Sequence, residues 1–297
     1  MNESIVVTTG LTKRYGEHLA VDAVSMRVRT GEIYGFLGPN GAGKTTTLRM
    51  LTGLVRPSAG TATVHGSAPG DPGVLRRVGV LIEGPGFYPY LSGRDNLRVL
   101  ARYRGLGDRE VTQALARVDL TTRADDRFRT YSLGMKQRLG VGAALLGDPD
   151  LLVLDEPTNG LDPAGLAEMR SLIVDLAADG HTVLLSSHQL AEVQEICHRV
   201  GVISGGRLLA ESTVAELRGT ASLLVRAEPV DVAVEAVRTL SDAPVRAGAE
   251  GIRIKTTAAM APAVARAVVQ AGADLLELRV DEKSLEEVFF ELTEVAK

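Results

Sequence analysis

One glycine-rich segment has the residue types and the spacing needed to bind phosphate. Residues 38–45 read GPNGAGKT, and they follow a short apolar and aromatic run at 32–37 that predicts a buried strand. The next residues, TTLRMLTGL, predict a helix. A glycine-rich loop that ends in Lys-Thr, between a strand and a helix, is the setting in which proteins cradle the phosphates of a nucleotide.

The chemistry of a phosphate explains these residue types. Glycines let the backbone curl so that its N–H groups point inward, at a helix N-terminus whose dipole favours anions. Lys44 adds a charge for the β- and γ-phosphates, and Thr45 adds a hydroxyl for Mg²⁺. The alternative is a turn that only links the strand to the helix. We predict a nucleotide site formed by Gly38, Pro39, Asn40, Gly41, Ala42, Gly43, Lys44, Thr45 and Thr46.

Two adjacent carboxylates form a second candidate site. Residues 151–154 read LLVL and predict a buried strand that ends in Asp155 and Glu156. Ligands of a parallel sheet bind at the carboxyl ends of its strands, where both side chains would lie. Asp155 could hold Mg²⁺ and Glu156 could polarise the attacking water. Taken alone, the pair could equally be two solvated acids at the end of a strand.

The neighbours of this pair favour the catalytic interpretation. The full string is LLVLDEPTNGLDP, a predicted strand with the sequence HTVLLSS follows at 181–187, and His188 comes next. Before the pair, residues 131–138 read YSLGMKQR and open a predicted helix. With the phosphate loop, this order resembles the ATPase cassette of ABC transporters over about residues 6–217, some two thirds of the chain.

The resemblance implies roles for further residues. Tyr15 is similar to the aromatic residue that stacks on adenine, and His188 to the residue that senses the γ-phosphate. Catalysis would then depend on Glu156, His188 and Lys44. In the family two copies share their sites, so the resemblance implies a dimer that binds ATP and Mg²⁺. Contacts across that dimer would come from Ser132, Gly134 and Asp162.

Two functional positions depart from the usual family pattern. The signature LSGGQ is here YSLGM, and the glutamine that normally follows the strand at 78–82 is Glu83. The string IEGPGFYPYLSGRDNL, together with YSLGMKQRL, resembles the bacitracin-resistance and lantibiotic-immunity exporters. We therefore retain Glu83 as a nucleotide-site residue and metal ligand, although a carboxylate adds negative charge where an amide would not.

The elements around these motifs predict two domains. The fold class is α/β: a P-loop ABC ATPase cassette, with a RecA-like core and antiparallel β and helical subdomains, followed by a small α+β domain. We place the cassette at 1–219 with its helical subdomain at about 90–147, and the accessory domain at 220–297. Residues 87–91 could line a groove for a membrane partner or belong to the core. The accessory domain shows a βαββαβ-like order, which predicts a split-βαβ sandwich, and its end resembles daunorubicin-resistance ATPases.

Composition narrows the partners. The 297 residues carry a formal net charge of -4 and one cysteine, Cys197, and no stretch has the roughly 18 apolar residues of a membrane span. Nucleic acid is therefore not an expected partner. We predict a cytoplasmic protein at the inner face of the membrane, bound to a separate permease subunit. It would power export of a drug-like, antibiotic-like or other amphipathic substrate, as a homodimer or with a related ATPase subunit.

Two other functions remain open on the sequence alone. One is a soluble ABC-type ATPase that acts on nucleic acid or ribosomes, but paired cassettes, long coiled coils and basic arms are not visible in the sequence. The other is a nucleotide-binding regulator without hydrolysis, suggested by Glu83 and the altered signature. Against it, the residues for hydrolysis are all present: Lys44, Thr45, Asp155, Glu156 and His188.

Overall fold

Continuous apolar runs form the centre of the first of two compact units. A computed structural model describes residues 3–84, 86–218, 222–240, 245–248, 251–281 and 285–295. The chain divides into residues 1–213 with 292–297, and residues 214–291. We expected the division after residue 219, but the helix α8 (Val214–Arg218) groups with the second unit.

The first unit is built around a six-stranded sheet with the strand order β10-β9-β4-β8-β7-β6. Strands β4 and β6 to β9 pair in parallel, and only β10 runs antiparallel. Every residue of β4, β7 and β8 is buried, because both faces of the parallel sheet are covered by other elements. The strands are β4 (Ile33–Leu37), β6 (Val78–Leu81), β7 (Leu151–Asp155), β8 (Thr182–Ser187), β9 (Arg199–Ser204) and β10 (Arg207–Thr213).

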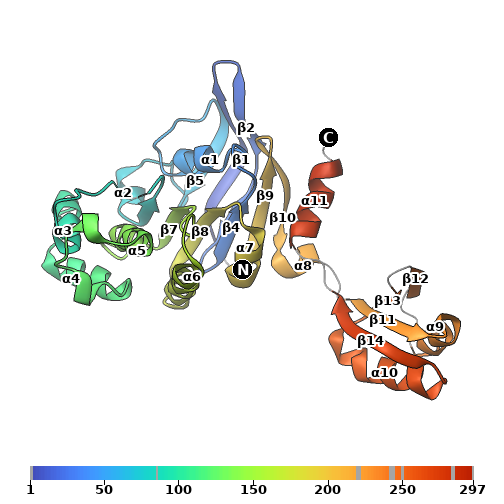
Figure 1. Ribbon diagram of the computed structural model, residues 1–297. Coiled ribbons are helices and arrows are strands. Elements are labelled where there is room, and N and C mark those ends of the chain that lie inside the picture. The colour runs from blue at the N-terminus through green and yellow to red at the C-terminus, as the bar shows by residue number, and fades with distance from the viewer. Residues whose placement is uncertain are drawn as a thin grey trace. The chain divides into compact units, whose positions relative to one another are not determined.

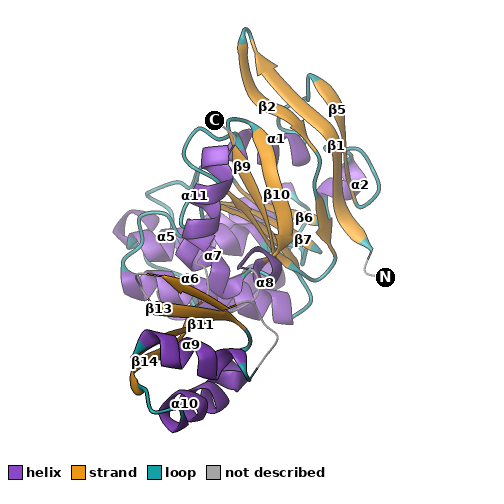
Figure 2. Cartoon of the chain, turned by 90° about the vertical axis from the view of Figure 1, so that its right-hand side faces the viewer, coloured by secondary structure: helices purple, strands orange, loops and turns teal. Residues whose placement is uncertain are grey.

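A second, antiparallel sheet packs against the same core. Its strand β1 pairs with β2, β3 and β5, and the β1–β2 hairpin extends beyond the larger sheet (Figure 2). Core side chains from this sheet, from β4 and from the helix α1 (Lys44–Leu51) form one apolar cluster, which includes Val6, Val28, Phe36 and Leu48. The strands are β1 (Ser4–Tyr15), β2 (His18–Val24), β3 (Arg27–Arg29) and β5 (Ala59–Val64).

Helices complete the first unit, and α3, α4 and α5 gather into one helical lobe (Figure 1). Side-chain caps define where several helices start: Ser92 accepts from Asp95 N at the start of α3, and Asp71 accepts from Gly73 N at α2. The helices are α1 (Lys44–Leu51), α2 (Pro72–Leu75), α3 (Gly93–Tyr103), α4 (Asp108–Arg117), α5 (Leu133–Ala144), α6 (Pro163–Ala178) and α7 (Leu190–Ile196), with 3₁₀ turns at Thr121–Arg123 and Phe128–Thr130.

The second unit has the split-βαβ order that the sequence predicted. Its antiparallel sheet runs β12-β13-β11-β14, so each helical crossover skips one strand. Alternate residues of β11 and β13 pack against α9 and α10 in a common apolar core. The elements are β11 (Ser222–Glu228), α9 (Val230–Arg238), β12 (Val245–Gly248), β13 (Gly251–Lys255), a 3₁₀ turn (Ala258–Met260), α10 (Ala261–Gln270) and β14 (Asp274–Asp281). The last helix, α11 (Leu285–Val295), begins in this unit, and its residues from 292 onward group with the first unit.

A buried charge network joins β4, β9 and β10. The Arg199 guanidinium lies 3.4 Å from Glu32 Oε1 and 3.6 Å from Glu211 Oε1, and all three side chains are at most 20% exposed. The Tyr34 hydroxyl donates to Glu211 Oε1 at 2.9 Å. Burial, and then the Glu211 carboxylate, hold the pKa of Tyr34 well above its usual value. One arginine therefore pairs with two carboxylates inside the unit.

We predict that Arg199→Met lowers the free energy of unfolding by about 3 kcal/mol, because it leaves two buried carboxylates without a cation. Urea unfolding at neutral pH measures the loss. Arg207→Met is the control: Arg207 is 72% exposed in its pair with Asp22, so its loss costs at most about 1 kcal/mol. Equal losses in both variants would contradict the prediction.

Candidate functional site

The phosphate loop connects the end of β4 to the start of α1, and its glycines are required by geometry. Gly41 and Gly43 have φ angles of 79° and 104°, in the left-handed region that other residues avoid. A Cβ on Gly38 would lie 2.2 Å from Ile203 O, and one on Gly43 would lie 2.5 Å from Ala20 O. The loop can therefore keep this shape only with glycine at these positions.

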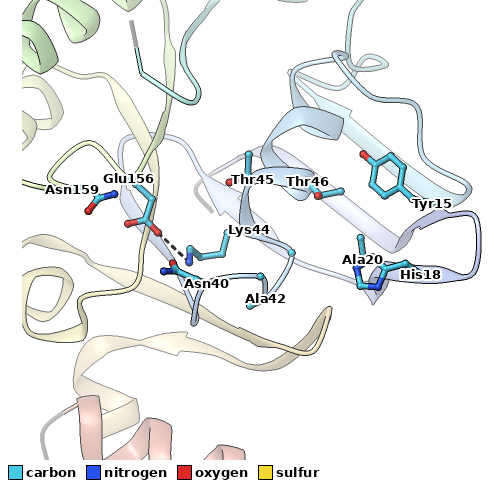
Figure 3. Close-up of a pocket in the computed structure, with 12 residues that line it drawn as sticks. Tyr15, His18, Ala20, Asn40, Ala42, Lys44, Thr45, Thr46, Glu156 and Asn159 are labelled. Atoms are coloured by element: carbon cyan, nitrogen blue, oxygen red, sulfur yellow. Dashed lines mark ion pairs between the residues drawn. The ribbon is translucent and has the colours of Figure 1, made fainter.

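Lys44 is the first residue of α1, and its side chain is 6% exposed. Its Nζ donates to Gly38 O at 2.7 Å and to Pro39 O at 3.2 Å, and it lies 3.1 Å from Glu156 Oε1 (Figure 3). These three oxygens use the three N–H donors of the ammonium group. The positive charge is thus held inside the curve of the loop, at the N-terminus of α1.

Asp155 links the loop to the neighbouring strand β8. Its Oδ2 accepts from the Thr45 hydroxyl at 2.8 Å, and its Oδ1 accepts from the Ser186 hydroxyl at 2.5 Å. A hydroxyl and a carboxylate side by side are the hard oxygen ligands that Mg²⁺ takes in nucleotide sites. The donor set therefore fits Mg²⁺ held together with the phosphates.

Glu156 follows directly with an unusual backbone. Its φ is 49°, in the left-handed region, and its backbone N–H donates to Ser186 Oγ at 3.0 Å. The carboxylate points one oxygen at Lys44 Nζ and lies with the other 2.7 Å from His188 Nδ1. Backbone strain of this kind costs about 1 to 3 kcal/mol and persists where the surroundings impose it, often at active sites.

A cavity of about 370 Å³ opens over the loop. It brings together most of the predicted phosphate-loop residues with Glu156 and Tyr15, and Figure 3 shows Tyr15 and His18 on the same side of it. Sequence reasoning missed His18, which pairs with Tyr15 across the hairpin turn, and it missed Ser186. It also missed two further lining residues, Ala20 and Asn159.

The signature residues and Asp162 do not line this cavity. Ser132 caps α5 by accepting from Met135 N at 3.2 Å, and Gly134 lies in the first turn of that helix. Asp162 caps α6 by accepting from Gly165 N at 3.0 Å. The two helix starts are neighbours, because a Cβ on Gly134 would meet Leu161 at 3.9 Å. They form a second polar surface of the cassette.

Glu83 also lies outside the cavity lining. It follows β6 with a φ of 62°, and its carboxylate forms an ion pair with Arg49 of α1. Its side chain is 64% exposed. The described contacts therefore place Glu83 against the far end of the phosphate-loop helix, and its role as a metal ligand stays a prediction.

These features define a class of protein: a P-loop nucleotide-binding cassette in which two acidic residues end a central strand and the second of them contacts both the loop lysine and a histidine. Across the part of the chain that the structure describes, no helix is both long and apolar enough to cross a membrane. The family profile described as "ABC transporter" matches residues 21–159.

Two relatives match over nearly the whole chain, and a third matches over about two thirds of it. The bacitracin transport ATP-binding protein BcrA of Bacillus licheniformis is 39% identical over 97% of both chains. The daunorubicin resistance ATP-binding protein DrrA3 of Streptomyces coeruleorubidus is 34% identical over 99% of this chain and 97% of that protein. The lantibiotic transport ATP-binding protein SrtF of Streptococcus pyogenes is 39% identical over 68% of this chain and 87% of that protein.

Solved structures match the cassette. A structure described as an ATP-binding subunit of an ABC transporter is 29% identical, with a TM-score of 0.65, over 72% of this chain and 92% of the other. The structure of cbiO1 from Clostridium perfringens is 26% identical, with a TM-score of 0.66, over 72% of this chain and 90% of the other. The chain therefore belongs to the ABC transporter family as an ATP-binding subunit that hydrolyses ATP. The resemblance and the fold class predicted from the sequence are confirmed.

We predict that Ser186→Ala lowers kcat for ATP about tenfold to hundredfold, because its hydroxyl orients both Asp155 and the backbone of Glu156. Steady-state hydrolysis at saturating Mg²⁺ measures the loss. Ser187→Ala is the matched control, since the Ser187 hydroxyl accepts only from Gln189 N among the described contacts. Equal losses in the two variants, or a loss that follows a lowered Tm, would point to a general packing defect.

Proposed function

We propose that this subunit powers export of a drug-like, antibiotic-like or other amphipathic substrate through a separate integral-membrane subunit. The supporting observations are two full-length relatives named for bacitracin transport and daunorubicin resistance. At the site, the observation that supports coupling to ATP is a series of contacts from Lys44 to Glu156 to His188. Lys44 and Glu156 line the cavity, and His188 contacts Glu156 from outside its lining.

ATP would bind with its phosphates in the loop and its base near the β1–β2 hairpin. Lys44 is placed to exchange its contacts with Gly38, Pro39 and Glu156 for phosphate oxygens, which keeps its buried charge compensated. The N-terminus of α1 adds its backbone N–H groups and its dipole. Tyr15, 45% exposed and lining the cavity, would stack on adenine.

Thr45 and Asp155 would hold Mg²⁺, which neutralises charge on the phosphates when it is bound. Their hydroxyl and carboxylate already contact each other at the head of α1, so little reorganisation is needed. Thr46 would reach an inner phosphate, since it lines the same cavity. The strand β8, through Ser186, fixes the orientation of the Asp155 carboxylate.

Hydrolysis would depend on the position of the Glu156 carboxylate. Once phosphate oxygens have taken over Lys44, one oxygen of Glu156 is free to accept a hydrogen bond from the attacking water. The other oxygen lies 2.7 Å from His188 Nδ1, and the family resemblance implies that the His188 ring would contact the γ-phosphate. Catalysis is then positioning and charge stabilisation, without a covalent intermediate.

A second copy, or a related subunit, would complete the site. Ser132 and Gly134 lie at the N-terminus of α5, where Leu133 is 47% exposed, and they lie outside the cavity of their own chain. A helix N-terminus presented to solvent suits the γ-phosphate of an ATP held by a partner. Asp162, next to this surface, would link the two sites. ATP then stabilises only the closed dimer and shifts its population.

The membrane subunit would hold the chain at the inner face of the membrane. Tyr88 and Tyr90 are 48% and 65% exposed between β6 and the helical lobe, which supports a docking role for residues 87–91. The accessory domain that we predict at 220–297 would contribute regulation, dimer contacts or docking. The loss-of-hydrolysis alternative is opposed by the connected catalytic residues described above.

We predict that co-expression with the membrane protein encoded beside this chain gives a complex whose ATPase activity rises on reconstitution. Lys44→Ala and Glu156→Gln should each reduce that activity at least about a hundredfold, because they remove the phosphate cation and the water-polarising base. ATP hydrolysis by purified complexes in lipid vesicles is the measurement.

The outcomes separate the functions. Hydrolysis that is never stimulated by a membrane partner would favour a soluble ATPase, and binding to RNA or DNA at low salt would strengthen that alternative. Nucleotide binding without any hydrolysis would favour a regulator. Arg56→Ala is a control variant, because Arg56 is an exposed residue after α1 that does not line the cavity.

A further inference from the structure

Three carboxylates are directed by the strands to one edge of the larger sheet. Strands β6 and β7 run in parallel with Leu81 opposite Leu154. Continuing that register brings Glu83 level with Glu156, one residue past Asp155. Three negative charges would then face the bound phosphates, which are themselves negative. Like charges at such spacing repel and would weaken nucleotide binding.

The structure avoids this arrangement by turning Glu83 away. The backbone leaves β6 in the left-handed region, with φ angles of 62° at Glu83 and 83° at Gly84. The Glu83 carboxylate forms an ion pair with Arg49, whose side chain is 30% exposed. The strained backbone and the ion pair act in the same direction, so the carboxylate is held on α1.

Arg49 is well placed to receive it. It lies in the last turn of α1, the helix whose first residues are Lys44 and Thr45. A cation near a helix C-terminus also interacts favourably with the helix dipole. Exposed ion pairs contribute little to folding stability. The main effect of this pair is therefore to fix the position of the Glu83 carboxylate.

We propose that Arg49 is a positioning residue that holds the Glu83 carboxylate on α1, away from the phosphates that Lys44 and Thr45 bind. This inference rests on the proposed function, since it concerns ATP at the phosphate loop. It also accounts for a glutamate where the family usually has a glutamine, because Arg49 compensates the extra negative charge. In this proposal the ion pair with Arg49 takes the place of the metal contact that the sequence predicted for Glu83.

The test measures binding of a fluorescent ATP analogue to the full chain, in excess EDTA and in excess Mg²⁺. With Arg49→Gln the freed carboxylate repels the metal-free nucleotide, and we expect its Kd in EDTA to rise about fivefold, the size expected for one unpaired charge acting through partly screened solvent. In Mg²⁺ the rise is less than about twofold, because the cation screens the carboxylate from the phosphates.

A second substitution at Glu83 tests whether Arg49→Gln acts through the Glu83 carboxylate or by damaging the fold. Arg49→Gln combined with Glu83→Gln should bring the Kd in EDTA back to the wild-type value, and Arg49→Lys should leave it unchanged. Arg56→Gln is the matched control, because it removes the same charge from an exposed site after α1. Circular dichroism confirms that each variant is folded.

The proposal is overturned if the double variant stays as weak as Arg49→Gln, or if Arg56→Gln weakens binding in EDTA as much, since net charge would then explain the effect. A wild-type chain that binds no nucleotide in either condition would overturn the proposed function and this inference together. Failure of the rescue alone overturns only the role of Arg49.

Discussion

The parallel register of β4, β8 and β7 is the constraint on which the site depends. Leu37 lies opposite Ser187, and Ser186 lies opposite Asp155. The three strands therefore end at one edge of the sheet. The phosphate loop begins at this edge, and Asp155 and Glu156 lie there. A slip of one residue would turn Asp155 to the other face of a sheet that is buried on both sides. The backbone pairing thus fixes the site before any side-chain contact forms.

The sheet edge also brings together the groups that compensate the buried charge of Lys44. A buried ammonium group is costly unless its donors are satisfied, and here two loop carbonyls and Glu156 satisfy them. Phosphate oxygens can replace these acceptors with little change in the number of hydrogen bonds. In the proposed mechanism, the same exchange would free the Glu156 carboxylate to accept a hydrogen bond from the attacking water. Nucleotide binding and activation of the water would then be linked through Lys44.

Local signals in the sequence predicted much of this arrangement. The GPNGAGKT loop between a strand and a helix is determined by residues that are close in the sequence, and so is the order of strands and helices in residues 222–281. Both could therefore be predicted from the sequence. Ser186 could not be identified, because its role comes from the pairing of β8 with β7. The Arg49 partner of Glu83 was missed for the same reason: a left-handed turn after β6 decides where that carboxylate points.

Some glycines of the cassette are required by packing within the chain, whereas Gly134 is not. At Gly38 and Gly43 a Cβ would collide with backbone oxygens of the same chain, so internal packing explains them. At Gly134 a Cβ would meet only Leu161 at 3.9 Å, an ordinary contact, and the residue lies in a regular helix. Glycine there costs about 1 kcal/mol relative to alanine, with no steric need inside the chain. A ligand that must approach the backbone of α5 closely would supply such a need. In the proposed dimer this ligand is the γ-phosphate of a partner's ATP, whose negative charge suits a helix N-terminus.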